Sequence, residues 1–282
     1  MTGTRQINRL PRAIAALVAG MSLLWAAALH AAEEERVEAF LNVTGFDVAL
    51  DSISLTAEDA ATMLGLEPGS FDDEWDRIAK DVFDTALMRD TAVTIMQETL
   101  SDEDLAHAAA FYASPLGQRL VEVENAAHTA PDTQKQEQGE SLVAAMVERG
   151  DERLGVLRDL SAAVDESGVA VRAVQEIQVR FLMAASNAGL LERELDEGAL
   201  RAMMRETENE LRLSMKQSAL ANAAYTYRDI SDEDLRAYLD ALRQPRMQRV
   251  YELMNAVQWE IMGDRYAAMA RRVGAVAGGQ EL

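Results

Sequence analysis

The sequence of 282 residues contains no cysteine, few aromatic residues and only three histidines. Without cysteine the chain has no disulfide, no thiol nucleophile and no residue on which a lipoprotein anchor could be built. Glycine loops of the Walker or dinucleotide type are absent too, as is a G-x-S-x-G nucleophile motif. We therefore expect no catalytic residue, no cofactor and a protein that is not an enzyme.

Basic side chains are also scarce. The chain has 27 lysines and arginines against 48 aspartates and glutamates, for a formal net charge of −21. Three of the arginines lie in the first 32 residues, so the rest of the chain is more acidic still. Because a surface of this sign repels phosphate groups, we expect neither nucleic acid nor anionic lipid as a partner.

The N-terminal segment 1–32 has the order of a secretory signal peptide. A basic region is followed by the apolar run 13–29, and Ala31 and Ala32 then lead into acidic residues. The alternative is an uncleaved anchor, because the apolar run is close to the minimum length that spans a bilayer. We favour cleavage, which predicts a periplasmic protein with no membrane span after signal removal.

Proline and glycine are sparse, with 5 and 16 residues, and apolar and polar residues do not alternate with period two. Alanine, leucine, methionine, glutamate and arginine dominate, which favours an all-α fold. Serines followed by acidic residues, as at Ser101 and Ser231, are helix-start signals. Helices are predicted at 34–44, 46–54, 57–66, 71–100, 102–113, 115–128, 134–149, 151–187 with a break near Gly168, 197–228, 232–243 and 245–274.

Two segments of the chain resemble each other. Residues 101–126 and 231–256, aligned without a gap, are identical at 11 of 26 positions, whereas chance gives one or two. The polar stretch 128–140 lies between them. The pattern predicts a helical bundle built from two related helical repeats, 33–130 and 131–282, packed about a pseudo-twofold axis.

The segment LSDEDLAHAAAFYASPLGQRLVE, from Leu100 to Glu122, is similar to the signature of the bacterial domain of unknown function numbered 2059. That signature has a leucine and an acidic cap, followed by FY-x-S-P-x-G. The resemblance implies an exported, all-helical protein of Gram-negative bacteria. Because the family has no established activity, it supplies no catalytic residue.

The second copy lacks most of this signature, because Ala241, Leu242, Gln244 and Met247 replace its characteristic residues. A local explanation is sufficient for much of the motif, since a serine cap and a proline at the first helical position restart a helix. Any function that the repeat does not explain is expected at the unduplicated part. The candidate interaction surface consists of Phe111, Tyr112, Ser114, Pro115 and Gly117.

Both copies also share a set of polar residues. They are Gln118, Arg119, Glu122 and Asn125 in the first copy, and Gln248, Arg249, Glu252 and Asn255 in the second. Such a stripe is either a hydrogen-bond network between helices or a strip that faces a ligand. We favour the network, because a single ligand site needs only one copy.

A metal site has little support. Asp104 and His107 have the i, i+3 spacing of helical di-metal proteins, but the equivalent pair in the second copy is Asp234 and Ala237. Since a metal needs several converging ligands, we interpret His107 as a surface residue and expect no metal.

The functional hypothesis is therefore a non-enzymatic binding or protein-interaction module whose partner is an unknown periplasmic protein. The alternative is a carrier or sensor of a small apolar ligand held between the two halves. Methionines concentrate in the second half; we interpret them as core residues, although methionine also lines adaptable grooves. An enzyme of unknown type is the third hypothesis.

Overall fold

The computed structural model describes residues 33–57, 60, 63, 73–165, 168–191 and 193–280. Within these ranges the chain forms helices and short connections and no β-strand, which confirms the all-α class. The predicted signal peptide at 1–32 and most of the predicted helix at 57–66 lie outside the described residues. Each helix in the described ranges is too short or too polar to cross a lipid bilayer.

The first helix spans 33–44. The elements that follow are α2 (Phe46–Ser52), the 3-10 helix η1 (Ile53–Thr56), α4 (Asp73–Val82), α5 (Thr85–Thr99), α6 (Asp102–Tyr112), α7 (Pro115–His128), α8 (Asp132–Arg149), α9 (Arg153–Val164), α10 (Ala170–Asn187), α11 (Glu197–Glu206), α12 (Glu208–Thr226), α13 (Asp232–Leu242) and α14 (Pro245–Gln280).

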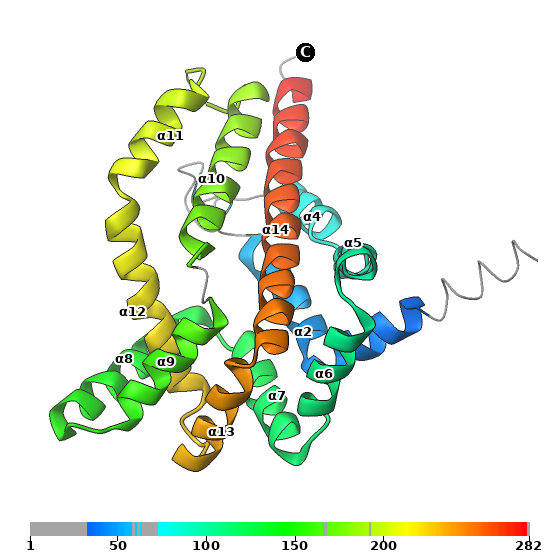
Figure 1. Cartoon of the computed structure of the whole chain (residues 1–282). Coiled ribbons are helices and arrows are strands. Elements are labelled where there is room, and N and C mark those ends of the chain that lie inside the picture. Colours follow the sequence, from blue (N-terminus) through cyan, green and yellow to red (C-terminus); the bar gives the residue numbers. More distant parts are fainter. Residues whose placement is uncertain are drawn as a thin grey trace, which may run out of the picture.

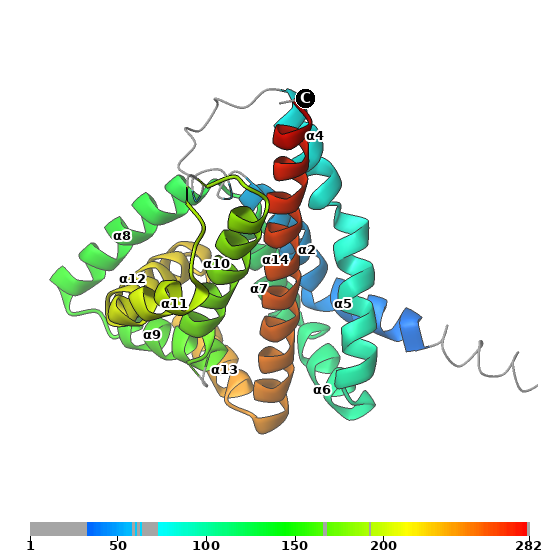
Figure 2. The same ribbon diagram turned by 90° about the horizontal axis from the view of Figure 1, so that it is seen from above.

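The long helix α14 stands in the middle of the molecule (Figure 1, Figure 2). Helix α10 packs along one side of it, and α4, α5 and α6 contact it from the other. A second group consists of α8, α9 and α12, with α8 against α12 and α9 against α13. Helix α7 contacts α2, α6 and α12, so it lies between the two groups.

The last helix carries an apolar stripe whose residues recur every three or four positions. Met247, Val250, Met254, Val257 and Ile261 are all buried. Each such side chain contributes about 1.5–3 kcal/mol when it leaves water. This stripe explains why α14 occupies the centre of the core.

The prediction of one helix over 71–100 is wrong. Helix α4 ends at Val82, and α5 begins at Thr85 because the side chain of Asp84 accepts a hydrogen bond from the backbone N–H of Leu87 at 2.9 Å. An aspartate in this position satisfies an orphan donor of a new helix. The break changes the buried face, so that Met88 is buried, while Ala86, which a continuous helix would align with Ile78 and Val82, is exposed.

The predicted helix over 197–228 is likewise divided, into α11 and α12 at Thr207. The predicted break near Gly168 is confirmed, since α9 ends at Val164 and α10 begins at Ala170. Gly168 has a φ of 62°, a left-handed conformation that favours glycine.

Most of the polar stretch 128–140 is helical rather than a free linker, because α8 begins at Asp132. Helix α8 approaches α12 closely at Gly139, where an added Cβ would lie 2.1 Å from the carbonyl oxygen of Ala221. Only glycine permits this approach.

The helix pairs α6–α7 and α13–α14 correspond closely. Helices α6 and α13 both have 11 residues, and their caps Ser101 and Ser231 each accept from the N–H three residues on. Two reciprocal ion pairs join the helix pairs: Asp104 to Arg249 at 2.8 Å and Asp234 to Arg119 at 2.8 Å. This exchange is the arrangement that a pseudo-twofold axis produces; the common origin of the two copies stays a prediction.

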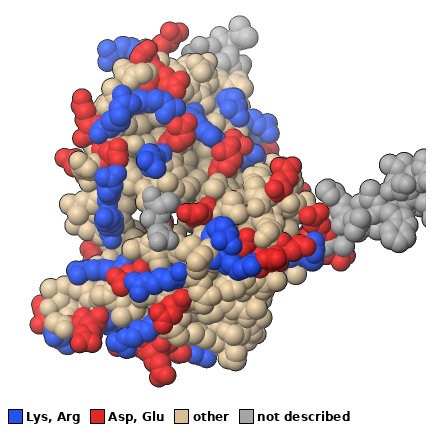
Figure 3. Space-filling model, in the orientation of Figure 1, with Lys and Arg blue, Asp and Glu red and all other residues tan. Residues whose placement is uncertain are grey.

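Charges of both signs alternate on the face shown in Figure 3. Pairs such as Arg180–Glu260 at 3.0 Å and Arg243–Asp159 at 2.8 Å are exposed. Exposed pairs contribute at most about 1 kcal/mol each. On this face the acidic residues therefore do not form one continuous patch.

Candidate functional site: a cavity with one glutamate and four tyrosines

A cavity of about 390 Å³ lies between α2 and α7 on one side and α9, α12 and α14 on the other. Its volume falls in the range of small-molecule sites, about 300–1,000 Å³. Part of the wall is apolar, formed by Phe46, Ala49, Leu160, Val164, Leu242 and Met254. Polar side chains are interspersed, including Asn125, Ser161, Asn222, Thr226, Asn255 and Gln258. The cavity is therefore amphipathic rather than apolar.

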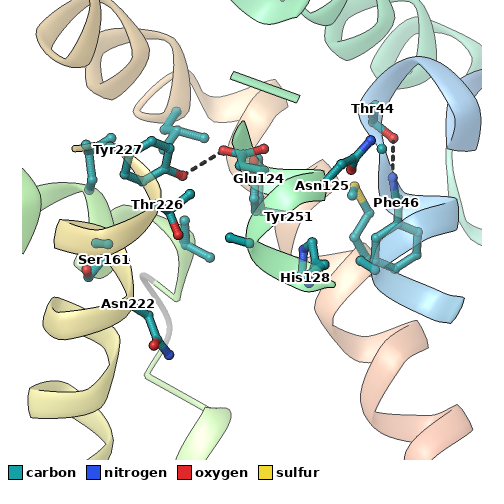
Figure 4. A pocket seen from close by; sticks show the side chains of 18 of the residues that line it. Thr44, Phe46, Glu124, Asn125, His128, Ser161, Asn222, Thr226, Tyr227 and Tyr251 are labelled. Atoms are coloured by element: carbon teal, nitrogen blue, oxygen red, sulfur yellow. Dashed lines mark hydrogen bonds between the residues drawn. The ribbon is translucent and has the colours of Figure 1, made fainter. Parts of the chain in front are cut away.

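Glu124 of α7 meets four tyrosines at this cavity. Its Oε1 accepts hydrogen bonds from the hydroxyls of Tyr227 at 2.6 Å and Tyr238 at 3.0 Å. The hydroxyl of Tyr251 lies 2.8 Å from that of Tyr238 and also bonds the hydroxyl of Tyr112. Figure 4 shows the contact between Tyr227 and Glu124. The five groups come from five different elements, so the packing of the helices alone brings them together.

The direction of the hydrogen bonds follows from the supply of protons. Each phenol can donate only one hydrogen bond. Because Tyr227 and Tyr238 donate to Glu124, the hydroxyl of Tyr238 can only accept from its other neighbours, Tyr251 at 2.8 Å and Tyr112 at 3.3 Å. Tyr112 and Tyr251 are also hydrogen-bonded to each other, with one phenol donating to the other. Burial raises the pKa of all four phenols above its ordinary value. At neutral pH the tyrosines are therefore protonated and act as donors toward the carboxylate.

Burial raises the pKa of Glu124 to about 7, although the hydrogen bonds from Tyr227 and Tyr238 act to lower it. Both of these phenols bind the same oxygen, Oε1, and no donor among the described residues binds Oε2. An ionised carboxylate in such surroundings is only half solvated by the protein. The site therefore has an unused acceptor and a charge that is costly to keep.

Further along α7, His128 and Lys135 of α8 also line the cavity. Burial lowers the pKa of His128, and the nearby positive charge of Lys135 lowers it further. Lys135 is paired with Asp132 at 2.6 Å. At neutral pH this part of the wall thus has a neutral imidazole and a paired ammonium group.

Residues 87–145 match a family model described as an uncharacterized protein conserved in bacteria, DUF2059. The family resemblance is confirmed. The match runs from α5 through α6 and α7 into α8 and therefore includes Tyr112 and Glu124, but not Tyr227, Tyr238 or Tyr251. No curated protein and no solved structure matches the chain.

The DUF2059 signature residues do not form one exposed face. Tyr112 is only 2% exposed and belongs to the tyrosine cluster, and Phe111 stacks on the ring of Tyr238 with 5.9 Å between centroids. Ser114 caps α7 through the N–H of Gly117 at 3.1 Å. Gly117 is buried. A Cβ added there would lie 2.3 Å from the carbonyl oxygen of Phe111, so the position has no room for a side chain. Pro115 alone of the five is exposed.

The DUF2059 match also contains the first copy of the shared polar set. Arg119 and Arg249 exchange ion pairs with the opposite helix pair, and each donates to the carbonyl of its own helix-start proline. Gln118 donates to the carbonyl oxygen of Ala113 at 3.3 Å. Glu122 is exposed.

In the second copy, Gln248 and Asn255 instead bind α9. The side chain of Gln248 donates to the carbonyl oxygen of Ala163, and that of Asn255 donates to the carbonyl oxygen of Val164, each at 2.9 Å. Glu252 is exposed, like Glu122. The structure thus distributes the eight residues over separate contacts, with Asn125 and Asn255 both lining the cavity.

Asp104 is occupied and unavailable to a metal. Its carboxylate accepts from Ser101 at 2.8 Å and from Arg249 at 2.8 Å, and the hydrogen bond from Arg249 is the main cause that lowers its pKa. His107 on the same helix is half-buried. In the described part of the chain, no three histidine or acidic side chains lie close enough together to hold a metal ion.

Sequence reasoning missed four of the five residues of the cluster. Glu124, Tyr238 and Tyr251 occupy positions at which the two copies differ, opposite Met254, Ala108 and Val121. Attention to identical positions therefore led away from them. The informative positions were those at which the copies differ, with a polar or aromatic residue in one copy and an apolar residue in the other.

Proposed function

We propose that this protein is a non-enzymatic binding protein that holds a small, partly polar molecule in the cavity between its two halves. The observation that carries this proposal is the Glu124 carboxylate, which lines the cavity with Oε2 unused while Oε1 is held by two phenols. An unpaired polar atom in a cavity is stabilised when a ligand pairs with it.

The sequence suggested a small apolar ligand, but the amphipathic wall of the cavity favours a ligand that is partly polar. Apolar side chains favour a hydrocarbon body, whereas asparagine, threonine and glutamate side chains orient polar groups. A protein-interaction module has less support, because Tyr112 and Gly117 of the family signature are buried.

Binding is favoured over catalysis for a chemical reason. Glu124 is the one acidic side chain among the described residues that line the cavity. The surrounding phenols have raised pKa values and serve as donors, so they provide neither a base nor a nucleophile. The remaining groups of the wall that could take part in proton transfer are His128 and Lys135, and among the described residues no hydrogen bond joins either of them to Glu124.

Export to the periplasm belongs to the same proposal and rests on the N-terminal sequence. The basic and apolar segments of 1–32 support a cleaved signal peptide. N-terminal sequencing of protein recovered from the periplasm should start near residue 33. A start at Met1 or Thr2 contradicts cleavage.

Native mass spectrometry of the protein purified from its periplasm tests ligand binding. Ala219 lines the cavity and is exposed on α12, so Ala219→Trp fills the cavity mouth without disturbing the core. Gln217→Trp is the matched control, because Gln217 is exposed on the same helix and does not line the cavity. The wild type and the control should carry a bound small molecule that Ala219→Trp lacks. Equal spectra for all three proteins would overturn the proposal.

A further inference from the structure

We propose that the cavity takes an organic amine, in which a protonated nitrogen binds Oε2 of Glu124 and a small apolar body contacts the apolar wall. This inference rests on the proposed function, since it names the chemical class of the ligand for the same cavity.

The first argument is the balance of charge. Apart from the tyrosines, the ionisable side chains among the described lining residues are Glu124, His128 and Lys135. Lys135 already has Asp132 as its partner at 2.6 Å, and His128 is kept neutral by burial. In the described part of the chain, no lysine, arginine or histidine forms an ion pair or a hydrogen bond with the carboxylate of Glu124. A cation from outside would therefore find an uncompensated negative charge in the cavity.

The second argument is hydrogen bonding. Oε1 is saturated by two phenols, whereas Oε2 has no donor among the described residues. A primary ammonium has three N–H donors and no acceptor. Glu124 lies between Tyr227 and Asn125, and Thr226 is close to the same side of the cavity (Figure 4). Asn125 and Thr226 carry side-chain oxygens, which are acceptors of the kind that the remaining N–H groups need.

The third argument is the rest of the wall. Leu160, Val164 and Met254 offer apolar surface to a hydrocarbon body. Burial of such a body removes apolar surface from water and so favours binding. A ligand with a cationic nitrogen at one end and a hydrocarbon group at the other matches both parts of the wall.

Isothermal titration calorimetry at about pH 8, where Glu124 is ionised, tests this inference with benzylamine and benzyl alcohol. These probes have the same apolar body and differ in the ammonium or hydroxyl group. The wild type should bind the amine at least about tenfold more tightly than the alcohol. Glu124→Gln should lose this preference, because glutamine keeps an acceptor for the phenols but has no charge.

Glu122→Gln is the matched control, since Glu122 is exposed on the same helix and forms no contact with the cavity. It should keep the preference of the wild type, and thermal unfolding should show that both variants are folded. Ala219→Trp provides a second test that leaves Glu124 intact, and it should weaken the binding of the amine.

Several results would overturn the inference. They are equal affinity of the wild type for the two probes, an amine preference that survives in Glu124→Gln, or no detectable amine binding at millimolar concentration. If both probes bind without preference and Ala219→Trp abolishes both, the proposed function stands and the amine inference fails. If neither probe binds and native mass spectrometry finds no ligand, both fail.

Discussion

The helix pairs α6–α7 and α13–α14 share the residues that cap and join their helices, but they differ in the residues that they contribute to the cavity. Residues that are identical in the two pairs form caps and ion pairs: Ser101 and Ser231 start the shorter helices, and the arginines exchange partners across the interface. The residues that differ build the cavity cluster. Glu124 comes from one pair, and Tyr238 and Tyr251 come from the other.

This division has a physical reason. Two similar halves can be joined by a pair of equivalent contacts when each half contributes the same groups. The same geometry then forms both contacts. A carboxylate held by phenols needs different groups on its two sides, an acceptor and donors. The site therefore arises where the two copies are unequal, and four predictions test this separation of scaffold and site.

The largest effect is expected where one copy requires glycine and the other holds a side chain. Gly117→Ala should lower the free energy of unfolding by about 3 kcal/mol or more, because the new Cβ would lie 2.3 Å from a backbone oxygen. The equivalent Met247 is fully buried in the core. Gly155→Ala is the control, since nothing lies within 4 Å of its Cβ, and it should be neutral or slightly stabilising. Equal effects in urea denaturation would contradict this prediction.

The two reciprocal ion pairs should differ in strength because they differ in burial. The side chain of Asp104 is 10% exposed, whereas that of Asp234 is 31% exposed. Asp104→Asn should cost about 2–3 kcal/mol, and Asp234→Asn should cost less than about 1 kcal/mol. Because the folded-state pKa of Asp104 is lowered, its contribution is present at neutral pH and is lost as the pH falls through that pKa. Equal costs in chemical denaturation would show that the two contacts are equivalent.

Glu124 should give the stability a pH dependence of the opposite sign. Its folded-state pKa of about 7 lies above the ordinary value of 4.5, so the folded state holds the proton more tightly than the unfolded chain. Its contribution to stability should fall as the pH rises from about 4.5 to about 7, by roughly 3 kcal/mol. Glu124→Gln should remove this decline and should melt higher than the wild type at about pH 8. Thermal unfolding of the wild type, Glu124→Gln and the control Glu122→Gln across this pH range checks this prediction. Parallel curves of melting temperature against pH for all three proteins would argue against it.

Within the cavity cluster, a small effect is expected from the loss of one phenol hydroxyl. Tyr251→Phe removes one hydroxyl that bonds both Tyr112 and Tyr238. The loss should cost about 1 kcal/mol, the usual net contribution of a hydrogen bond. Calorimetric unfolding checks this value. A cost of 3 kcal/mol or more would mean that the cluster is part of the scaffold rather than an addition to it.

Several features were predictable because they are local. The caps at Ser101 and Ser231 depend on residues within a few positions of one another, and both are confirmed. The breaks at Asp84 and Thr207 were missed. At Asp84 the apolar period continues across the break, and only the cap of the new helix marks it.

The sequence by itself determined the helical class, the positions of most helix starts and the family resemblance in the first half. Each of these follows from propensity, capping and spacing along one segment. Only the tertiary structure decided what Glu124 does. Its partners Tyr227 and Tyr238 lie 103 and 114 positions further along the chain, and burial by α12, α13 and α14 sets its pKa. Desolvation and a converging set of donors are properties of packed helices, so they exist only once the two halves have come together.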